Sequence, residues 1–360
     1  MLAQIRTVLL SIALVVSAAC SGSETSAGAG PVQAGSAAGA RALAGGPALA
    51  ANVPAAGSGA LASAPPASWP TSSSTCRGKL GMLRGKSTQT VMAGGLARTF
   101  VYYAPTTLDP NSPAPVIIIP HGYTMSADQM FDITRYSEIA ERERLIVIFP
   151  NGQPSTSILS GPWNVGSPDC SSTLGLLPLA QGDDQAFLNE MLHFAESDQC
   201  IDGQHVYMTG FSMGGYLSNE TGCLRPEIRA VAPHSGGSHD LSSCKTQHKP
   251  ALIMHFQGDG LIPYMCGQKA RERWVAKNGC QLDAPDVQMV SGGSCEYYKG
   301  CPADGQVAFC SFSIPPGGND TFPGHAWSGG SEVGAGAQFA IPQTESASEL
   351  SFRFFKQYAW

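Results

Sequence analysis

The sequence predicts an α/β fold in which a mostly parallel central sheet is covered by helices on both faces. Short apolar runs that are typical of buried parallel strands occur at 116–119, 145–149, 205–209 and 251–256, and an alternating strand pattern occurs at 96–103. Stretches with helical patterns lie between and after these runs, at 127–144, 183–196, 214–224, 269–278 and 346–358. Strands that alternate with helices favour a parallel sheet with helices on each face.

The charge balance excludes one broad class of function. The chain has 360 residues, of which 21 are Lys or Arg and 27 are Asp or Glu, so its formal net charge is −6. A nucleic-acid-binding protein needs a basic patch to neutralise phosphates, and this sequence has no basic run. We therefore expect no nucleic-acid partner.

The first residues have the pattern of an export signal. Arg6 precedes an apolar run at 8–16, and small residues follow at 17–19. This run is too short for a membrane-spanning helix, so we expect residues 1–19 to be a signal peptide that is removed. Cleavage before Cys20 would also allow that cysteine to be lipidated, although Ser17 stands where lipoproteins usually carry Leu. The expected location is extracellular, either secreted or anchored at a bacterial cell surface through Cys20.

The segment 20–75 differs in composition from the rest of the chain. It consists almost wholly of Ala, Gly, Ser and Pro, and Glu24 and Arg41 are its only charged residues. Such a segment has too few large apolar side chains to form a core, so we expect a disordered tether. Residues 76–360 are long enough to form one large catalytic domain with its own core.

The cysteines predict a disulfide-stabilised domain. Ten cysteines follow Cys20, and an even number in an exported chain indicates up to five disulfides. The sequence does not determine their pairing; Cys301 and Cys310 are one candidate pair across a hairpin. The cysteines are widely spaced, and neither a C-x-x-C nor an H-E-x-x-H motif occurs. We therefore expect neither a metal site nor a cofactor.

A candidate nucleophile lies in a glycine-rich motif. Residues 210–214 read Gly-Phe-Ser-Met-Gly, between the expected strand at 205–209 and a helical stretch. A G-x-S-x-G motif between a strand and a helix is typical of the nucleophile elbow of α/β-hydrolases, which presents its serine at the helix N-terminus. Ser212 is therefore the candidate nucleophile, although the motif alone also fits a glycine-rich turn with a solvated serine.

The order of residues after Ser212 identifies candidates for the acid and the base. In α/β-hydrolases the serine is followed by an Asp or Glu after a later strand and then by a His. Asp259 follows the apolar run at 251–256, and His325 is the one histidine after Asp259. Asp183 and Asp184 precede the serine and are expected at a helix N-terminus. His234 and His239 precede the acid and are interpreted as loop residues.

Two backbone N–H groups are candidates for an oxyanion hole. Ester hydrolysis places negative charge on the former carbonyl oxygen, and in this fold the donors follow the nucleophile and an earlier strand. The first donor is expected from Met213. The second is expected from Tyr123, in the loop after the run 116–119, where Gly122 allows the chain to turn. His121 is interpreted as a structural residue beneath the site.

These motifs together resemble a known family. They are Pro120-His121-Gly122, Pro150-Asn151-Gly152, Trp163-Asn164, Asp183-Asp184 with Phe187, the segment 210–215, His255 with Asp259 and Pro263-Tyr264, and Gly324-His325-Ala326-Trp327. In this order and over about residues 76–358, they resemble the exported α/β-hydrolase esterases grouped as feruloyl esterases, acetylxylan esterases and polyhydroxybutyrate depolymerases. The Tyr123 and Met213 pair also resembles the oxyanion pair of cutinase-like polyester hydrolases. Pro323 and Ser328 depart from the family pattern, as does the spacing between His255 and Gly258.

The resemblance implies a serine carboxylic ester hydrolase without a cofactor. Its expected substrate is an ester-decorated polysaccharide or a polyester, and the leading expectation is a feruloyl esterase that acts on plant cell-wall xylan. Trp163 and Trp327 are candidates for substrate binding and fit equally well as core residues. A polyhydroxybutyrate depolymerase, an acetylxylan esterase and a catalytically inactive surface-binding lipoprotein remain alternatives. The sequence does not determine the oligomeric state.

Overall fold

A computed structural model describes residues 76, 81, 83–109, 111–154, 160–166, 168, 170, 172–173, 182–316 and 322–358. All of them belong to one compact unit. The expected signal peptide and tether at 1–75 lie outside the described residues. Among the described residues, no helix combines the length and the apolar character needed to cross a membrane.

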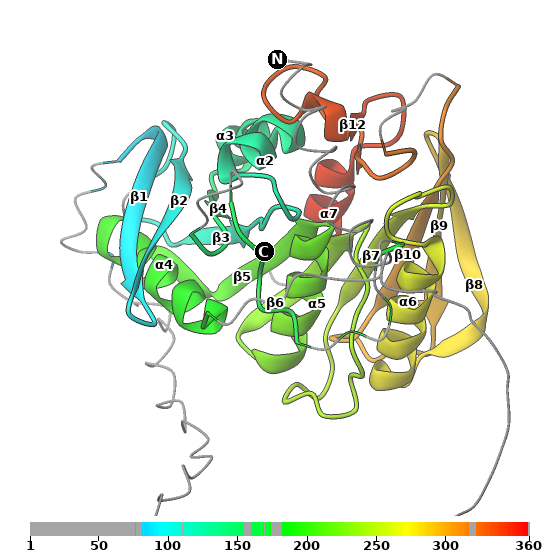
Figure 1. Cartoon of the computed structure of the whole chain (residues 1–360). Helices are drawn as coiled ribbons and strands as arrows, with labels where there is room; N and C mark the ends of the chain where they lie inside the picture. Colours follow the sequence, from blue (N-terminus) through cyan, green and yellow to red (C-terminus); the bar gives the residue numbers. More distant parts are fainter. Residues whose placement is uncertain are drawn as a thin grey trace, which may run out of the picture. The chain divides into compact units, whose positions relative to one another are not determined.

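The centre of this unit is a ten-stranded sheet with the order β1-β2-β4-β3-β5-β6-β7-β10-β9-β8 (Figure 1). Its strands are β1 (Gly85–Ala93), β2 (Leu96–Ala104), β3 (Ala114–Ile118), β4 (Ile146–Pro150), β5 (Ile201–Phe211), β6 (Ile228–His234), β7 (Ala251–Phe256), β8 (Gln281–Val290), β9 (Gly293–Lys299) and β10 (Val307–Phe312). The run from β4 to β10 is parallel, whereas β1 and β2 on one side and β9 and β8 on the other pair antiparallel. The expected mostly parallel sheet is confirmed.

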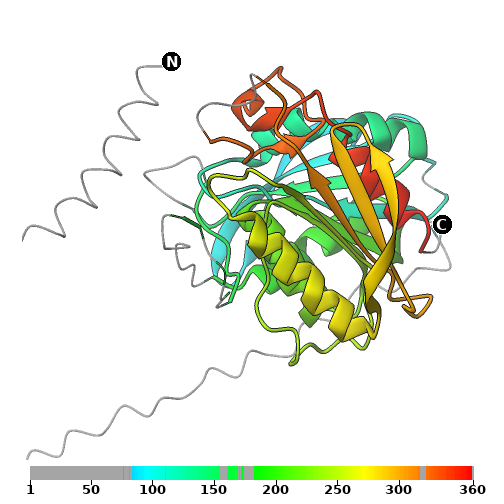
Figure 2. The same ribbon diagram turned by 90° about the vertical axis from the view of Figure 1, so that its right-hand side faces the viewer.

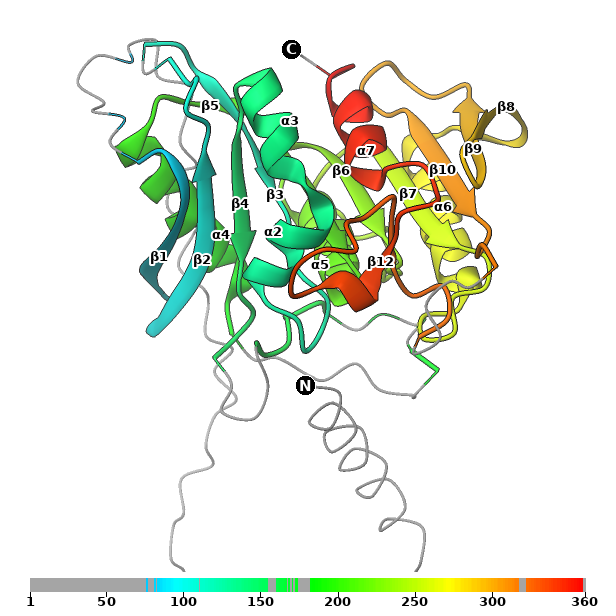
Figure 3. The same ribbon diagram turned by 90° about the horizontal axis from the view of Figure 1, so that it is seen from above.

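Helices cover both faces of the sheet, as expected (Figures 1 and 3). One face packs against α4 (Asp184–Asp198), α5 (Met213–Leu224) and α6 (Tyr264–Asn278). The other packs against α2 (Ala127–Thr134), α3 (Tyr136–Glu143) and α7 (Ala347–Phe355). A short 3₁₀ helix, η1 (Ala337–Phe339), and a small sheet of β11 (Trp327–Ser328) and β12 (Ala340–Ile341) complete the elements, and Figure 2 shows α6 along one side of the sheet.

The expected helix at 127–144 is wrong in one respect, because two helices occupy this range. A capping box between Ser126 and Gln129 starts α2, and Arg135 then adopts a left-handed conformation with φ of 53°. A left-handed residue cannot continue a right-handed helix, so α2 ends there and α3 begins at Tyr136.

The order in which strands are added to the sheet reverses at its centre. From β3 the chain passes to β4 on one side, whereas β5, β6, β7 and β10 extend on the other side. The carboxyl ends of β3 and β5 therefore meet at a topological switch point, where ligands bind in open α/β sheets.

Five disulfides connect the ten cysteines. They are Cys76–Cys200, Cys170–Cys266, Cys223–Cys244, Cys280–Cys301 and Cys295–Cys310. The candidate pair Cys301–Cys310 is wrong, because the register of the β9–β10 ladder places Cys295 directly opposite Cys310. Five disulfides are typical of proteins from oxidising compartments.

The disulfides should contribute unequally to stability. Cys170–Cys266 joins residues 96 positions apart and Cys295–Cys310 residues 15 positions apart. Cross-linking removes more entropy from the unfolded chain when the loop is longer. The expected stabilisation is about 4.7 kcal/mol for Cys170–Cys266 and about 3 kcal/mol for Cys295–Cys310. Replacing both cysteines of each pair by Ala should therefore lower the guanidinium unfolding midpoint more for the first pair. The reverse order would show that loop length does not govern these bridges.

Candidate active site

Ser212 forms the sharp turn between β5 and α5. β5 ends at Phe211 and α5 begins at Met213, so one residue makes the connection. Its φ of 56° and ψ of −118° are unfavourable for a residue with a Cβ atom, and such strain persists only where the surroundings hold it. The Ser212 N–H donates to His234 O at 2.9 Å, and its carbonyl accepts from Tyr216 N–H at 3.1 Å.

After this turn, the first residues of α5 lie very close to the chain that follows β3. A Cβ atom on Gly214 would lie 2.1 Å from the carbonyl oxygen of Pro120, and one on Gly210 would lie 2.5 Å from the carbonyl oxygen of Gly214. Both neighbouring atoms belong to the backbone and cannot move aside cheaply. These two positions of the motif therefore require glycine.

The structure brings Ser212, His325 and Asp259 into one line of hydrogen bonds. His325 Nε2 lies 2.9 Å from Ser212 Oγ, and His325 Nδ1 lies 2.9 Å from Asp259 Oδ2. The three residues are 7%, 2% and 7% exposed. With the proton on Nδ1 donated to the carboxylate, Nε2 can accept the serine hydroxyl proton, which is the arrangement that activates a serine nucleophile.

Asp259 is held as a carboxylate by several donors. Its Oδ1 accepts from the N–H groups of Leu261 at 3.0 Å and Ile262 at 2.8 Å, and His255 Nε2 lies 3.4 Å from Oδ2. Burial alone would raise the Asp259 pKa, but the interactions with His325 and His255 outweigh it and hold the pKa well below its usual range. Asp259 is therefore ionised at neutral pH.

The loop after β3 lies against Ser212. A Cβ atom on Gly122 would lie 3.0 Å from Ser212 Cβ, which brings the next residue, Tyr123, to the edge of the site. Among the described residues, no hydrogen-bond acceptor is found for the backbone N–H of Tyr123 or of Met213. Met213 directly follows Ser212 and Tyr123 directly follows Gly122, so both N–H groups stay candidate oxyanion donors.

His121 anchors this loop from beneath. Its ring is fully buried; Nδ1 donates to Gly122 O at 2.6 Å, and Nε2 accepts from Gly152 N–H at 2.9 Å. Trp163 Nε1 donates to the His121 carbonyl at 2.8 Å. Burial lowers the pKa of His121 to about 4, against a hydrogen bond to Gly122 that raises it. The ring is therefore neutral, consistent with the expected structural role.

The expectation that Trp163 and Trp327 offer substrate-binding surface is corrected. Their side chains are 1% and 0% exposed, so both are core residues, the alternative that the sequence left open. Trp163 faces His121, with ring centroids 5.0 Å apart, and Trp327 Nε1 donates to Ser348 Oγ. The polar ends of both indoles are thus directed to the protein and not to a ligand.

Other residues singled out by the sequence have structural positions. Asp183 caps α4 by accepting from Ala186 N–H, and Asp184 pairs with the buried Arg98 at 2.8 Å, so the expected helix N-terminus is confirmed. His239 lies in a loop as expected, beside Glu220. The loop interpretation of His234 is wrong: it is the last residue of β6 and is fully buried.

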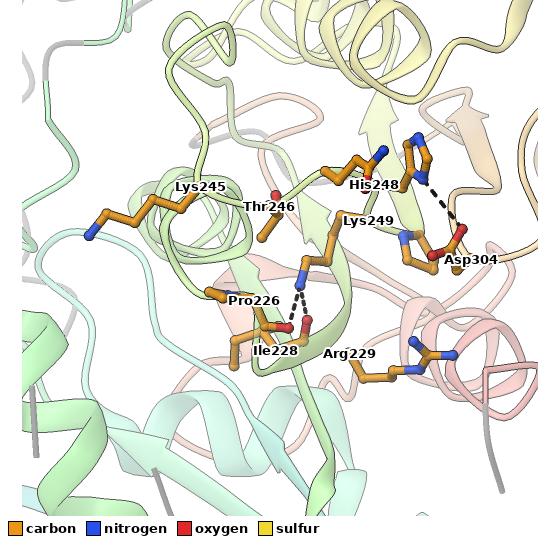
Figure 4. A pocket seen from close by; sticks show the side chains of 10 residues that line it. Pro226, Ile228, Arg229, Lys245, Thr246, His248, Lys249 and Asp304 are labelled. Carbon is orange, nitrogen blue, oxygen red and sulfur yellow. Dashed lines mark hydrogen bonds and ion pairs between the residues drawn. The ribbon is translucent and has the colours of Figure 1, made fainter. Parts of the chain in front are cut away.

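A separate pocket of about 220 Å³ lies at the amino ends of β6 and β7, opposite to the end that carries Ser212 (Figure 4). Lys249 lies beneath it and donates to the carbonyls of Arg225, Pro226 and Ile228. Burial lowers the pKa of Lys249 to about 7. Lys249 therefore connects the chain before β7 to the chain at the start of β6. Figure 4 shows its ammonium directed at the carbonyls of Pro226 and Ile228. In the part of the chain that the structure describes, no group of three metal-binding side chains occurs.

The buried histidines predict how stability depends on pH. His121 and His234 both have pKa values lowered by burial, whereas an unfolded chain binds their protons near pH 6.5. Below pH 6.5 the unfolded state therefore binds more protons, and stability falls as the pH drops toward 4, by up to about 1.4 kcal/mol per pH unit for each histidine. Asp259 has a lowered pKa and loses its contribution only below about pH 4. The free energy of unfolding, measured with urea between pH 7 and 5, gives this slope, and H121N should reduce it. A free energy of unfolding that does not change with pH would contradict the lowered pKa values of His121 and His234.

No model of a known protein family matches the chain. Feruloyl esterase D of Neurospora crassa is 28% identical over 278 residues, which are 73% of this chain and 91% of that protein. Feruloyl esterase B of Piromyces equi is 27% identical over 60% of this chain, and the probable feruloyl esterase C of Aspergillus clavatus is 32% identical over 39% of it. The matches span 42% and 52% of those two relatives, so about half of their length has no counterpart here.

A solved structure supports the fold independently. The acetyl xylan esterase from Aspergillus awamori superposes with a TM-score of 0.53 over 75% of this chain and 99% of that one, at 16% sequence identity. At this identity the likeness concerns the fold alone. Together with the sequence relatives, it supports a carboxylic ester hydrolase of the α/β-hydrolase fold that is similar to feruloyl esterases.

Proposed function

We propose that the protein is a serine carboxylesterase, and specifically a feruloyl esterase that releases hydroxycinnamoyl groups from plant cell-wall xylan. The observation that carries the esterase mechanism is the hydrogen-bonded line from Ser212 Oγ through His325 to Asp259. The substrate class is supported by the names of the sequence relatives, which are feruloyl esterases.

The geometry supports a two-step acyl transfer. Ser212 Oγ attacks the ester carbonyl while His325 Nε2 takes its proton, and Asp259 stabilises the imidazolium that forms. His325 then gives the proton to the leaving alcohol oxygen, which leaves the acyl group on Ser212. A water molecule, deprotonated by His325, then attacks the carbonyl of this acyl-enzyme. The bond between Ser212 Oγ and the acyl carbon breaks, His325 returns the proton to Ser212 Oγ, and the acid is released.

The backbone N–H groups of Met213 and Tyr123 are proposed to stabilise the oxyanion. Ser212 is the N-cap residue of α5, so the Met213 N–H lies at the first turn, where the helix favours negative charge. Gly122 lies so close to Ser212 that an added Cβ atom would be 3.0 Å from Ser212 Cβ, which supports the N–H of the next residue, Tyr123, as the second donor. Donors fixed before the reaction stabilise charge without reorganising during it.

A series of aromatic rings leads from His325 toward the surface. Phe211 lies 4.8 Å from the His325 ring, Phe339 lies 6.2 Å from Phe211, and Phe322 stacks on Phe339 at 6.1 Å with an angle of 15°. Phe339 and Phe322 are half-buried, and Tyr123 is 38% exposed at the edge of the site. Partly exposed aromatic residues linked to His325 through Phe211 suit a flat aromatic acyl group, and we assign to them the substrate-binding role expected of Trp163 and Trp327.

Export and surface anchoring remain part of this proposal. The disulfides support an oxidising compartment, and the signal pattern at 1–19 supports export. Lipidation of Cys20 would attach the 20–75 tether to a membrane, so that the domain at 76–360 could reach polymeric substrate from the cell surface.

Loss of the nucleophile tests the mechanism. Ser212→Ala removes the attacking oxygen but keeps the oxyanion donors and substrate contacts, so kcat on a p-nitrophenyl ester should fall by about 10⁶-fold. A fluorophosphonate probe should label the wild type and not the variant. An unlabelled, inactive wild-type protein would favour the catalytically inactive surface-binding alternative, whereas an active S212A would refute the serine mechanism.

Substrate preference tests the acyl group. Methyl ferulate should exceed a short-chain methyl ester in kcat/KM by about tenfold, because contacts with the ring help to hold the carbonyl against Ser212. F339A should reduce this preference and leave the rate on a short acetyl ester nearly unchanged, with exposed Val333 as the matched control in V333A. No aromatic preference together with release of hydroxybutyrate from polymer would favour the polyester depolymerase, and selective release of acetate from acetylated xylan would favour the acetylxylan esterase.

A further inference from the structure

His234 contacts both halves of the candidate site at once. Its carbonyl accepts the Ser212 N–H at 2.9 Å, so its backbone holds the strained turn. Its ring Nε2 accepts the Ser328 N–H at 3.2 Å, three residues after His325. One buried residue at the end of β6 therefore connects the turn that carries Ser212 to the loop that carries His325.

These contacts determine which ring nitrogen carries the proton. A backbone N–H can only donate, so the Ser328 contact requires an unprotonated Nε2 on His234. The proton of the neutral ring then lies on Nδ1, which is 3.0 Å from Ser235 Oγ and can donate to it. The Ser328 N–H thus selects the tautomer, and the Ser235 hydroxyl accepts the proton that this tautomer carries.

Aromatic neighbours hold the plane of the ring. His234 stacks on Trp327 with centroids 5.2 Å apart, and it lies parallel to Phe312 at an angle of 5°. Phe211 contacts it edge-on, and the same Phe211 ring lies 4.8 Å from the His325 ring. The ring therefore has little freedom to rotate away from Ser328.

The surroundings also keep the ring uncharged. Burial lowers the pKa of His234 well below its usual value, and the nearby His255 and His325 lower it further, against a smaller opposite effect of Asp259. A protonated ring would direct an Nε2–H at the Ser328 N–H and break the contact. The contact is therefore maintained over the pH range in which an esterase with a histidine base operates.

We propose that His234 is a positioning residue, whose neutral ring acts as a hydrogen-bond acceptor that fixes the His325 loop relative to Ser212. This inference rests on the proposed serine mechanism. Ser212 and His325 are 113 positions apart in the chain, yet Ser212 Oγ lies 2.9 Å from His325 Nε2. Maintaining this distance requires a contact between the Ser212 turn and the His325 loop. A displacement of about 1 Å at such a pair can cost about 10²-fold in rate.

Two variants separate positioning from packing. His234→Phe keeps an aromatic ring in the stack but removes the acceptor, so kcat should fall by at least about tenfold, with KM changed by less than about twofold and fluorophosphonate labelling slowed in parallel. His234→Gln places an amide oxygen where it can accept from Ser328 N–H and should recover part of the lost kcat. Tyr136→Phe is the matched control: it removes a buried hydrogen bond to Ser351 on the same face of the sheet and should lower stability without lowering kcat.

A third variant covers the case in which the ring replacements do not fold. Ser235→Ala removes the acceptor of the Nδ1 proton and should lower kcat by a few-fold, with KM again nearly unchanged. H234F or S235A with wild-type kcat and only a lower melting temperature would overturn the proposal and reduce His234 to a packing residue. Failure of the serine mechanism gives a different result, because wild-type protein would then neither hydrolyse esters nor react with the fluorophosphonate.

Discussion

The close approach of α5 to the carboxyl end of β3 is the constraint on which the rest of the site depends. There is no room for a Cβ atom between Gly214 and the Pro120 carbonyl, where the separation would be 2.1 Å. This contact fixes the start of α5 against the strand beside β5, so the chain must turn within the single residue Ser212. The same contact brings the loop after β3 under the serine, and in this way one packing requirement places both the hydroxyl and the neighbouring N–H groups.

The polar groups around this turn are arranged so that one residue carries the negative charge. Asp259 accepts from two backbone N–H groups. Burial raises its pKa, but the interactions with His325 and His255 outweigh burial and hold the pKa well below the usual range. The buried rings of His121 and His234 are neutral, and each uses one nitrogen as donor and the other as acceptor. Neutral imidazoles can connect backbone segments inside the core without the cost of a buried charge.

The sequence predicts the parts of this structure that depend on local patterns. Apolar runs such as 251–256 mark the central strands, and the glycine motif marks the turn at Ser212, because both are set by short-range sterics and burial. Five strands of the ten-stranded sheet were not predicted: β1, β6, β8, β9 and β10. The edge strand β8 has almost all its side chains exposed, so it has no buried face to give an apolar pattern. The break at Arg135 and the position of Trp327 in the core depend on tertiary packing, which composition and spacing do not report. Disulfide pairing depends on strand register in the same way.

The proposed role of His234 shows why only part of such a site can be predicted from sequence. The hydroxyl, the imidazole and the carboxylate are recognisable by type and order, but the distances between them are set by residues that resemble ordinary core side chains. The segment after His325 illustrates this: it passes over α2, where Ala335 bonds to Gln129 and Asp132 and Ser331 bonds to Ile133. α2 itself begins just after the Tyr123 loop, so the same helix restrains the loops of the proposed base and of a proposed oxyanion donor. His234 contacts the same segment at Ser328 and also accepts from the Ser212 N–H, so it connects the segment to β6 and the Ser212 turn. The reacting groups are thus located by contacts on two sides, and each contact is made by residues distant in the chain.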